Sequence, residues 1–540
     1  MASKTHAILP GSKRAKDPTA VKVGELNPKE TIDVTLDLAG PPMPGPDEYV
    51  GQTVTPEEFA EKFGARQADV DKVAKALRKY GLKVENVSLA TRSMRVSGTI
   101  AAMERAFRPG LALMKSPVQG EYRGRQGSLQ IPAELKGIVL AVLGLDNRKM
   151  ARRKAGTSKA GASALAALTP SDIEQRYNFP AGDCANQRIG VAEFGGGYFE
   201  SDMTTYCTKF QRPVPNIQAV SVDAPAYTLA QILALPKPQR KEQLDNSIEV
   251  MMDVEIIAGL CAKADITVYF SNFDQQGWVD LLDRVIADRP VALSVSWGLA
   301  EDDPSWSANA VKAIDNRLNS ARLLGITACI SSGDDGSGDQ VNDGRAHVDF
   351  PSSSPNAMGV GGTMLTQSGA SVKEVVWWDS PGQRTNNGGG SSGGGISTVF
   401  NRPAWQNVKI KSLNAKSIDG RVVPDVAALA GDPMYDLITV GQPQSYGGTS
   451  ASTPLWAALI ARVNSLLPVP KQQRFLAPLL YAKAGNGQPV GKTMSRDITS
   501  GNNASNPQPG KGYKAGKGYD AVTGWGVPDG NKMLSALATI

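Results

Sequence analysis

The chain has 540 residues, of which 41% are hydrophobic and 20% charged, so two or three domains of about 150 residues are expected. Its longest apolar run, residues 137–145, is shorter than the roughly 20 residues that cross a bilayer, which excludes an integral membrane protein. The first ten residues also lack the apolar stretch of a secretory signal, so we expect export by another route or a leader outside this sequence.

Charge is spread unevenly, although the formal net charge is only +6. Residues 1–165 hold 27 Lys and Arg against 17 Asp and Glu, whereas the remainder holds 31 against 35. This split predicts a basic segment that sits on, or later leaves, an acidic one. Nucleic-acid binding is the alternative, but the basic residues are scattered with few aromatics between them, so no nucleic-acid partner is expected.

The N-terminal part has the pattern of a small α+β domain. Residues 31–40 alternate like a strand, and residues 55–81 contain two helix-period segments that begin with capping residues. Short strands over 84–97 and a helix over 100–107 follow. This order predicts a domain with a sheet on one side, which we place at residues 1–150.

A linker and a second domain follow. Residues 148–168 are first basic and then rich in Ala, Gly and Ser, without a core-forming period, and we place the linker itself at 151–168. In residues 169–540, apolar strands near 188, 265, 291 and 326 alternate with helical stretches. Such alternation is typical of an α/β fold with a mostly parallel sheet and helices on both faces, whose sites lie at the C-terminal ends of strands.

The four cysteines show no metal-ligand spacing, so buried free thiols are expected at Cys184, Cys207, Cys261 and Cys329. Histidine is more informative, because the chain contains only His6 and His347. Any mechanism that needs a histidine base therefore has one credible candidate, His347.

The sharpest chemical motif is GGTSASTP at 447–454, which opens an apolar helix over 455–466. Small residues allow a tight turn that exposes the Ser450 hydroxyl at a helix start, where free N–H groups and the dipole can receive a developing oxyanion. The alternative is a plain N-cap.

A second motif is a pair of carboxylates on a helical segment over 247–262. Glu249 and Asp253 stand four residues apart and share one face, whereas Glu255 falls on another face and serves as the control for a merely solvated acidic helix. A third motif, SSGDDGSG at 331–338, follows a predicted strand directly and is either a turn or a site loop. The glycine-rich tract 388–395 is either a flexible linker or a tight loop close to a ligand.

Together these motifs, with SVSWG at 294–298 and HVDFP at 347–351, resemble the sedolisins or serine-carboxyl peptidases, and among them the kumamolisin-like members. The resemblance implies a subtilisin-like domain preceded by a ferredoxin-like prodomain. It also implies four catalytic roles: nucleophile Ser450, general base Glu249, orienting partner Asp253 and oxyanion-hole acid Asp334.

The resemblance further implies a supporting role for Glu193 and Trp297 and a pocket-lining role for Asp349. One residue departs from the family pattern. Asp335 stands where a small neutral residue is expected, which could alter the acidity of Asp334.

Residues 496–503 and 516–520 combine two carboxylates with glycine turns, a donor set that suits Ca²⁺. The resemblance implies one structural Ca²⁺ in this pattern, and the ligands it implies are Asp497, Ile498 O, Gly516 O, Gly518 O and Asp520.

The expected function is that of a self-processing endopeptidase acting on extended polypeptides in acid. Its prodomain is expected to act as an intramolecular inhibitor and folding aid, and the chain to be a monomer without a membrane partner; the family implies an extracellular location. Two alternatives stay open: an exopeptidase that releases tripeptides, and a catalytically silent peptide-binding scaffold.

Overall fold

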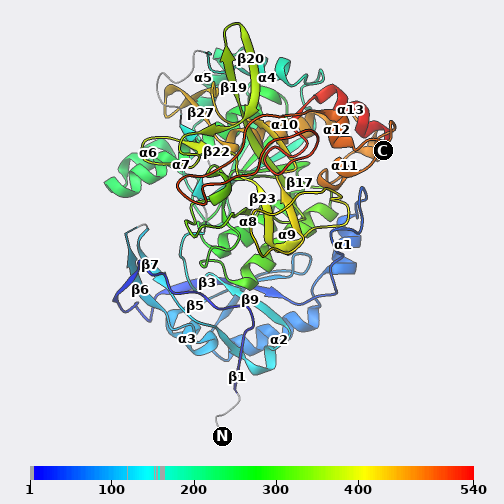
Figure 1. The fold of residues 1–540 in the computed structure, drawn as a ribbon. Coiled ribbons are helices and arrows are strands. Elements are labelled where there is room, and N and C mark those ends of the chain that lie inside the picture. Colours follow the sequence, from blue (N-terminus) through cyan, green and yellow to red (C-terminus); the bar gives the residue numbers. More distant parts are fainter. Residues whose placement is uncertain (1–4, 118, 151, 154–155, 158–164) are drawn as a thin grey trace.

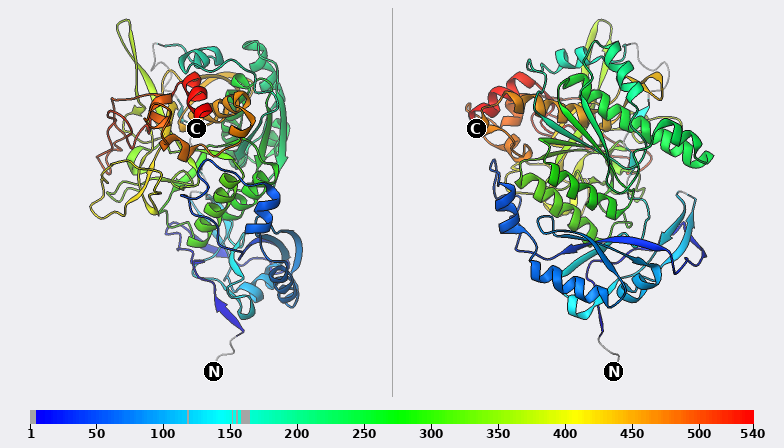
Figure 2. Two further views of the ribbon diagram at one scale, coloured as in Figure 1. Left: turned by 90° about the vertical axis from the view of Figure 1, so that its right-hand side faces the viewer. Right: turned by 180° about the vertical axis from the view of Figure 1, so that it is seen from behind.

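The computed structural model describes residues 5–117, 119–150, 152–153, 156–157 and 165–540. A smaller N-terminal body, blue and cyan in Figure 1, packs beneath a larger body that runs from green to red. Seen from behind in Figure 2, the sheet of the smaller body lies beneath helices of the larger one.

The smaller body contains the elements that the sequence predicts. Its central sheet has the order β4-β5-β3-β9 with antiparallel neighbours, which is the strand order of a ferredoxin-like domain. Thr55 and Glu58 form a capping box at the start of the first helix. The elements are β1 His6–Ile8, β2 Val21–Gly24, β3 Thr31–Leu38, α1 Pro56–Phe63, α2 Gln67–Arg78, β4 Lys83–Ser88, β5 Ser93–Thr99, α3 Ile100–Phe107, β6 Ala112–Ser116, β7 Gly120–Gly124, β8 Gln130–Pro132 and β9 Val139–Leu143.

The larger body is built on an eight-stranded sheet with the path β13-β14-β12-β15-β17-β19-β20 and β25 beside β19. All neighbours are parallel except β19 and β20, which confirms the α/β prediction. Its first elements are α4 Pro170–Arg176, β12 Arg188–Glu193, α5 Glu200–Lys209, β13 Asn216–Ser221, α6 Leu229–Ala234, α7 Lys237–Leu260, β14 Asp265–Phe270, α8 Gln275–Asp288, β15 Ala292–Val295, β16 Trp297–Ala300, α9 Ala308–Leu323, β17 Thr327–Ser331 and β18 Asp349–Phe350.

The remaining elements complete the sheet and cover it. They are β19 Met358–Ser368, β20 Ser371–Val376, β21 Trp378–Asp379, β22 Gly390–Ser391, β23 Gly395–Asn401, β24 Gly420–Val423, β25 Val426–Leu429, β26 Tyr435–Thr439, β27 Gln442–Gly447, α10 Thr449–Leu466, α11 Ala477–Tyr481, α12 Val490–Met494, β28 Ser495–Arg496, β29 Val527–Pro528 and α13 Gly530–Thr539. The core of the body includes α7 and α10, whose buried faces pack in one cluster with the strands.

The contact between the two bodies is both apolar and charged. Phe59, Phe63 and Met150 of the smaller body are buried in the same cluster as side chains of α8 and α9. Buried Arg317 of α9 pairs with Asp37 of β3. The Thr35 hydroxyl donates to Asp280 of α8 over 2.7 Å.

The predicted linker contains two short strands where its composition indicates none. β10 Arg152–Arg153 pairs antiparallel with β16, and β11 Gly156–Thr157 pairs antiparallel with β27. Residues 151, 154–155 and 158–164 of this segment lie outside the described residues. The backbone on both sides of residues 154–155 is thus held by strands of the larger body.

The cysteine prediction is wrong for two of the four thiols. Cys184 and Cys261 form a disulfide, whereas Cys207 and Cys329 are free and buried, as expected. The sequence gives no sign of the pairing because 77 residues separate the two partners. Within the described residues, no helix combines the length and apolarity needed to cross a membrane.

Candidate active site

The polar residues of the predicted site gather at the carboxyl edge of the parallel sheet. The parallel registers of β12, β15 and β17 bring their C-terminal ends to one edge. Glu193 ends β12, Ser296 follows β15, and Asp334 lies three residues beyond β17. These candidate residues therefore lie where a parallel sheet commonly carries its site.

The carboxylate pair comes from α7. Glu249 and Asp253 are both fully buried, one turn apart on the helix. Asp253 accepts from the hydroxyls of Ser294 over 3.2 Å and Ser296 over 2.8 Å. Burial raises the pKa of Asp253 well above its usual range, and the charge of Glu249 raises it further. Burial and the like charge of Glu249 thus both favour the protonated form of Asp253.

Glu193 and Trp297 lie against this pair. The Trp297 indole N–H donates to Glu193 Oε2 over 3.0 Å. Burial raises the pKa of Glu193 well above its usual range, and the nearby charges of Asp253 and Glu249 add to the shift. The structure thus brings both residues to the place where the resemblance gives them a supporting role.

Ser450 lies in the first turn of α10 and is fully buried. Ser296 connects it to the carboxylates, because the hydroxyl that bonds Asp253 also lies 3.3 Å from the Ser450 carbonyl oxygen. Among the described residues, the Ser450 hydroxyl has no hydrogen-bond partner. Catalytic hydrogen bonds often shorten only when substrate is bound, so this hydroxyl is not excluded from the role of nucleophile.

Asp334 faces the same helix start. Its Oδ1 accepts from the Thr449 backbone N–H over 2.8 Å and from the Thr449 hydroxyl over 2.7 Å. Its Oδ2 is buried and forms no hydrogen bond within the described part of the chain. Burial raises the pKa of Asp334 to about 6, although the Arg384 charge and the Thr449 bonds lower it. A protonated carboxyl at this position can donate to a developing oxyanion.

Asp335, which departs from the family pattern, forms an ion pair with Arg384. Asp335 Oδ2 lies 2.5 Å from Arg384 Nη2, and Asp335 also accepts from the Gln340 amide over 2.8 Å. The negative charge of Asp335 raises the pKa of Asp334, whereas the positive charge of Arg384 lowers it more strongly. The ion pair therefore offsets the effect expected from the extra carboxylate.

Asp349 lies in β18 beside the SGDDG loop. A methyl group added to Gly298 would lie 1.9 Å from Asp349 Oδ1, so the carboxylate packs directly on the backbone of β16, and only glycine permits this approach. This position is compatible with a pocket-lining role.

The glycine-rich tract forms a tight loop, so the interpretation as a flexible linker is wrong. The Gly393 N–H donates to Gly333 O over 2.7 Å, and the Ser391 N–H donates to Asp334 O over 2.9 Å. The tract thus holds the backbone that carries Asp334.

His347 has two carboxylate partners. Its Nδ1 lies 2.8 Å from Asp302 and its Nε2 lies 2.8 Å from Asp343, and these contacts raise its pKa although burial lowers it. Both ring nitrogens are therefore occupied. His6 lies in the smaller body, where its Nε2 bonds the Arg105 carbonyl.

Glu255 does not behave as the solvated control that its position on the helix predicts. It is fully buried, and its Oε2 accepts from the Ile438 backbone N–H over 2.9 Å. Burial raises its pKa to about 9. The second face of α7 is covered by β26, which helical periodicity alone does not reveal.

The candidate calcium ligands come together in two loops. The Gly518 N–H donates to Asp497 Oδ2 over 2.8 Å, and the Gly516 N–H donates to Asp520 Oδ2 over 3.0 Å. Within the described residues, no three His, Cys, Asp or Glu side chains gather as a metal cluster, and the expected ligand set has only two carboxylates beside backbone carbonyls. Such oxygen donors fit a hard cation.

Three residues that form hydrogen bonds or ion pairs with the candidate site residues are given no role by the sequence patterns. Ser296 and Thr449 stand inside motifs that it did identify, SVSWG and GGTSAS, so their bonding was accessible in principle. Arg384 lies in a loop without pattern, about 50 residues from its partner Asp335, and no signal could have found it.

Known proteins resemble both bodies of the chain. Residues 18–148 match the family described as Pro-kumamolisin, activation domain, and residues 241–524 match the Subtilase family. Kumamolisin of a Bacillus species is 34% identical over 98% of this chain and 96% of its own length. Tripeptidyl-peptidase sed5 of Aspergillus fumigatus is 26% identical over 98% of this chain and 97% of its own. A solved structure of Pseudomonas sedolisin, a serine-carboxyl proteinase, aligns with a TM-score of 0.58 and 24% identity over 69% of this chain and 98% of that one, which shows the same fold.

Proposed function

Because the chain belongs to the kumamolisin-like sedolisins and is a serine-type peptidase with a subtilisin-like domain and an N-terminal prodomain, we propose that it is an acid-acting serine-carboxyl endopeptidase made as a self-processing zymogen. One observation supports this most strongly: Ser296 links buried Asp253 to the Ser450 backbone and buried Asp334 bonds the adjacent Thr449, while both histidines are bonded elsewhere. Family membership as a peptidase argues against the catalytically silent scaffold.

The proposed reaction uses the carboxylates for proton transfer. Ser450 Oγ attacks the substrate carbonyl carbon while ionised Glu249 accepts the proton of the Ser450 hydroxyl. Asp253 orients Glu249 and adds negative charge beside it. Protonated Asp334 and the Ser450 N–H donate to the oxyanion. Collapse breaks the peptide C–N bond, the amine leaves with the proton from Glu249, and water then releases the acyl group by the reverse proton route.

Self-processing is supported by the path of the linker. β10 lies on β16, next to Ser296, and β11 lies on β27, which leads into the helix that carries Ser450. Two short pieces of chain that pair as strands with the larger body near Ser450 resemble the way a peptide substrate adds a strand to a sheet edge. We therefore propose that the chain is cut between Arg153 and Gly156, inside the expected processing linker of residues 151–168, and that the prodomain inhibits until then.

We also propose one structural Ca²⁺ at Asp497, Asp520 and the carbonyls of Ile498, Gly516 and Gly518. The fit is supported by the contact between the two loops, since the Gly518 N–H donates to Asp497 across them, while the Gly516 N–H donates to Asp520 within the second loop. When bound, the cation would supply charge that keeps these loops together.

An extracellular location is proposed as well, and we propose that the processed enzyme is a monomer. The Cys184–Cys261 disulfide supports an oxidising compartment, because such bonds are rare in the cytosol. The tripeptidyl exopeptidase remains the second candidate, since a relative that covers nearly the whole chain bears that name.

Incubation with an unfolded protein at acidic pH tests the proposal. The wild type should cut at internal positions, whereas Ser450→Ala and Glu249→Gln should be inactive. Release of N-terminal tripeptides alone would favour the exopeptidase. Full activity of Ser450→Ala would refute the mechanism.

A further inference from the structure

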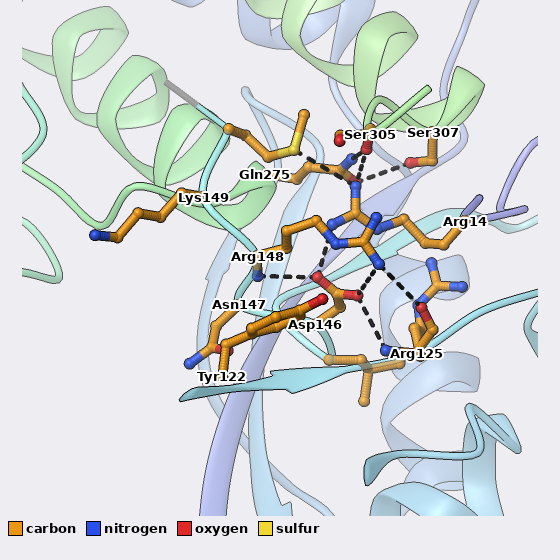
Figure 3. A network of polar contacts seen from close by, with 12 residues as sticks. Arg14, Tyr122, Arg125, Asp146, Asn147, Arg148, Lys149, Gln275, Ser305 and Ser307 are labelled. Atoms are coloured by element: carbon orange, nitrogen blue, oxygen red, sulfur yellow. Dashed lines mark hydrogen bonds and ion pairs between the residues drawn. The ribbon is translucent and has the colours of Figure 1, made fainter. Parts of the chain in front are cut away.

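The prodomain is joined to the cleft by a short strap, residues 146–150, that is held by hydrogen bonds at several points. Asp146 anchors its start, because its carboxylate bonds Arg14 over 2.6 Å and the backbone N–H groups of Arg125 and Arg148 over 3.1 and 2.9 Å. Figure 3 shows these arginines gathered around Asp146, with Lys149 pointing away from them.

Lys149 is held by two residues of the larger body. Its ammonium group pairs with Glu242 in the first half of α7, and it lies 5.4 Å from the ring centre of Phe273, in the loop before α8. A carboxylate and an aromatic face together favour a cation. Both residues stay with the enzyme once the prodomain has left.

The next residue of the strap, Met150, is held through its backbone and buried through its side chain. Its N–H donates to the Phe273 carbonyl, and its carbonyl accepts from the Trp278 indole N–H over 3.0 Å. These two bonds do not depend on which side chain the residue carries. The fully buried side chain packs in the apolar cluster of α8.

The direction of the strap places these contacts on one side of the reacting bond. The chain runs from Lys149 through β10 on β16 to β11 on β27, next to Ser450. If the chain is cut between residues 153 and 156, Lys149 is the fifth to seventh residue before the cleaved bond. The same side of the molecule has a cleft of about 1450 Å³, whose lining includes Glu242, Asp303 and Phe273.

We propose that Glu242 and Phe273 form a remote substrate subsite of the processed enzyme, which binds a lysine or arginine side chain five to seven residues before the cleaved bond, with an apolar residue next to it. This inference rests on the proposed endopeptidase and names its substrate class: extended polypeptides with a basic-apolar pair upstream. Tripeptide release leaves only three residues on this side, so the subsite has a use only in internal cleavage.

Peptides that copy residues 147–160 test this subsite. Three versions carry Lys, Gln or Glu at position 149, and kcat/KM is measured for the processed wild type and for Glu242→Gln. The wild type should prefer Lys over Gln by about tenfold, mainly through KM, because the pair is half-exposed and distant from the reacting bond. Glu242→Gln should lose this preference, and Glu242→Lys should favour the Glu peptide.

The control is Glu200→Gln, a change of an exposed glutamate on α5, which should keep the wild-type preference. Equal kcat/KM for the Lys and Gln peptides with the wild type, or an unchanged preference in Glu242→Gln, would overturn the subsite while leaving the peptidase intact. Failure of the wild type to cut any of the peptides or an unfolded protein would instead refute the proposed function, and the subsite with it.

Discussion

Replacing Asp334 by Asn should remove the alkaline limb of the pH–activity profile. Asp334 must be neutral to donate to the oxyanion, and burial raises its pKa to about 6. The neutral fraction is thus about ten elevenths at pH 5 and about one eleventh at pH 7, so the wild-type rate should fall about tenfold over this interval. An amide donates at every pH, so residual Asp334→Asn activity should stay flat there, at a lower level.

The charge of Arg384 allows a second test of the same prediction. Because this charge lowers the pKa of Asp334, Arg384→Gln should move the alkaline limb to higher pH, by up to about one unit. Initial rates on one internally cleaved peptide from pH 3 to 8 give all three profiles, with His347→Gln as the control of unchanged shape. A steep alkaline limb in Asp334→Asn, or loss of all activity in His347→Gln, would refute the carboxylate mechanism.

Two further predictions concern stability, and both are measured by thermal unfolding in the Ser450→Ala background. Asp146→Asn should destabilise the prodomain by about 2 to 4 kcal/mol at pH 6, because it breaks a buried ion pair. Since the pKa of Asp146 is lowered, its contribution is present above about pH 4 and is lost as the pH falls through the lowered value, so the difference between the two proteins should shrink in acid. Equal stability at pH 6 would contradict this. Chelation should lower the unfolding temperature of the Ca²⁺-purified protein that keeps Asp520, because a cation bound only to the native state stabilises it by mass action. It should not change the unfolding temperature of Asp520→Asn. If chelation leaves the unfolding temperature of both proteins the same, the calcium site is contradicted.

Much of the fold could be predicted because local patterns agree with tertiary placement. The alternation over β3, the capped helix start at Thr55 and the apolar strands near 188, 265, 291 and 326 all appear where they were expected, whereas α2 begins after Arg66 without a side-chain cap. Asp334 could be proposed because its motif follows a strand of the parallel sheet. Glu249 and Asp253 were indicated by their shared helical face and Ser450 by its small-residue helix start, and the resemblance implied their roles.

The failures concern long-range contacts. Glu255 is buried because β26 covers its face, and Cys184 meets Cys261 across 77 residues, so neither outcome is encoded in nearby sequence. The strands β10 and β11 form because the larger body offers β16 and β27 as partners, although their own composition is that of a linker.

The most direct test of the central claim is the N-terminus of the chain after its first exposure to acid. Full-length wild type, Ser450→Ala and Glu249→Gln are acidified in Ca²⁺, quenched at intervals and analysed by mass spectrometry. The account predicts a new N-terminus at residue 154, 155 or 156 in the wild type and intact chains in both variants. Processing of Ser450→Ala at the wild-type rate, or a fully active wild type that keeps its original N-terminus, would contradict it.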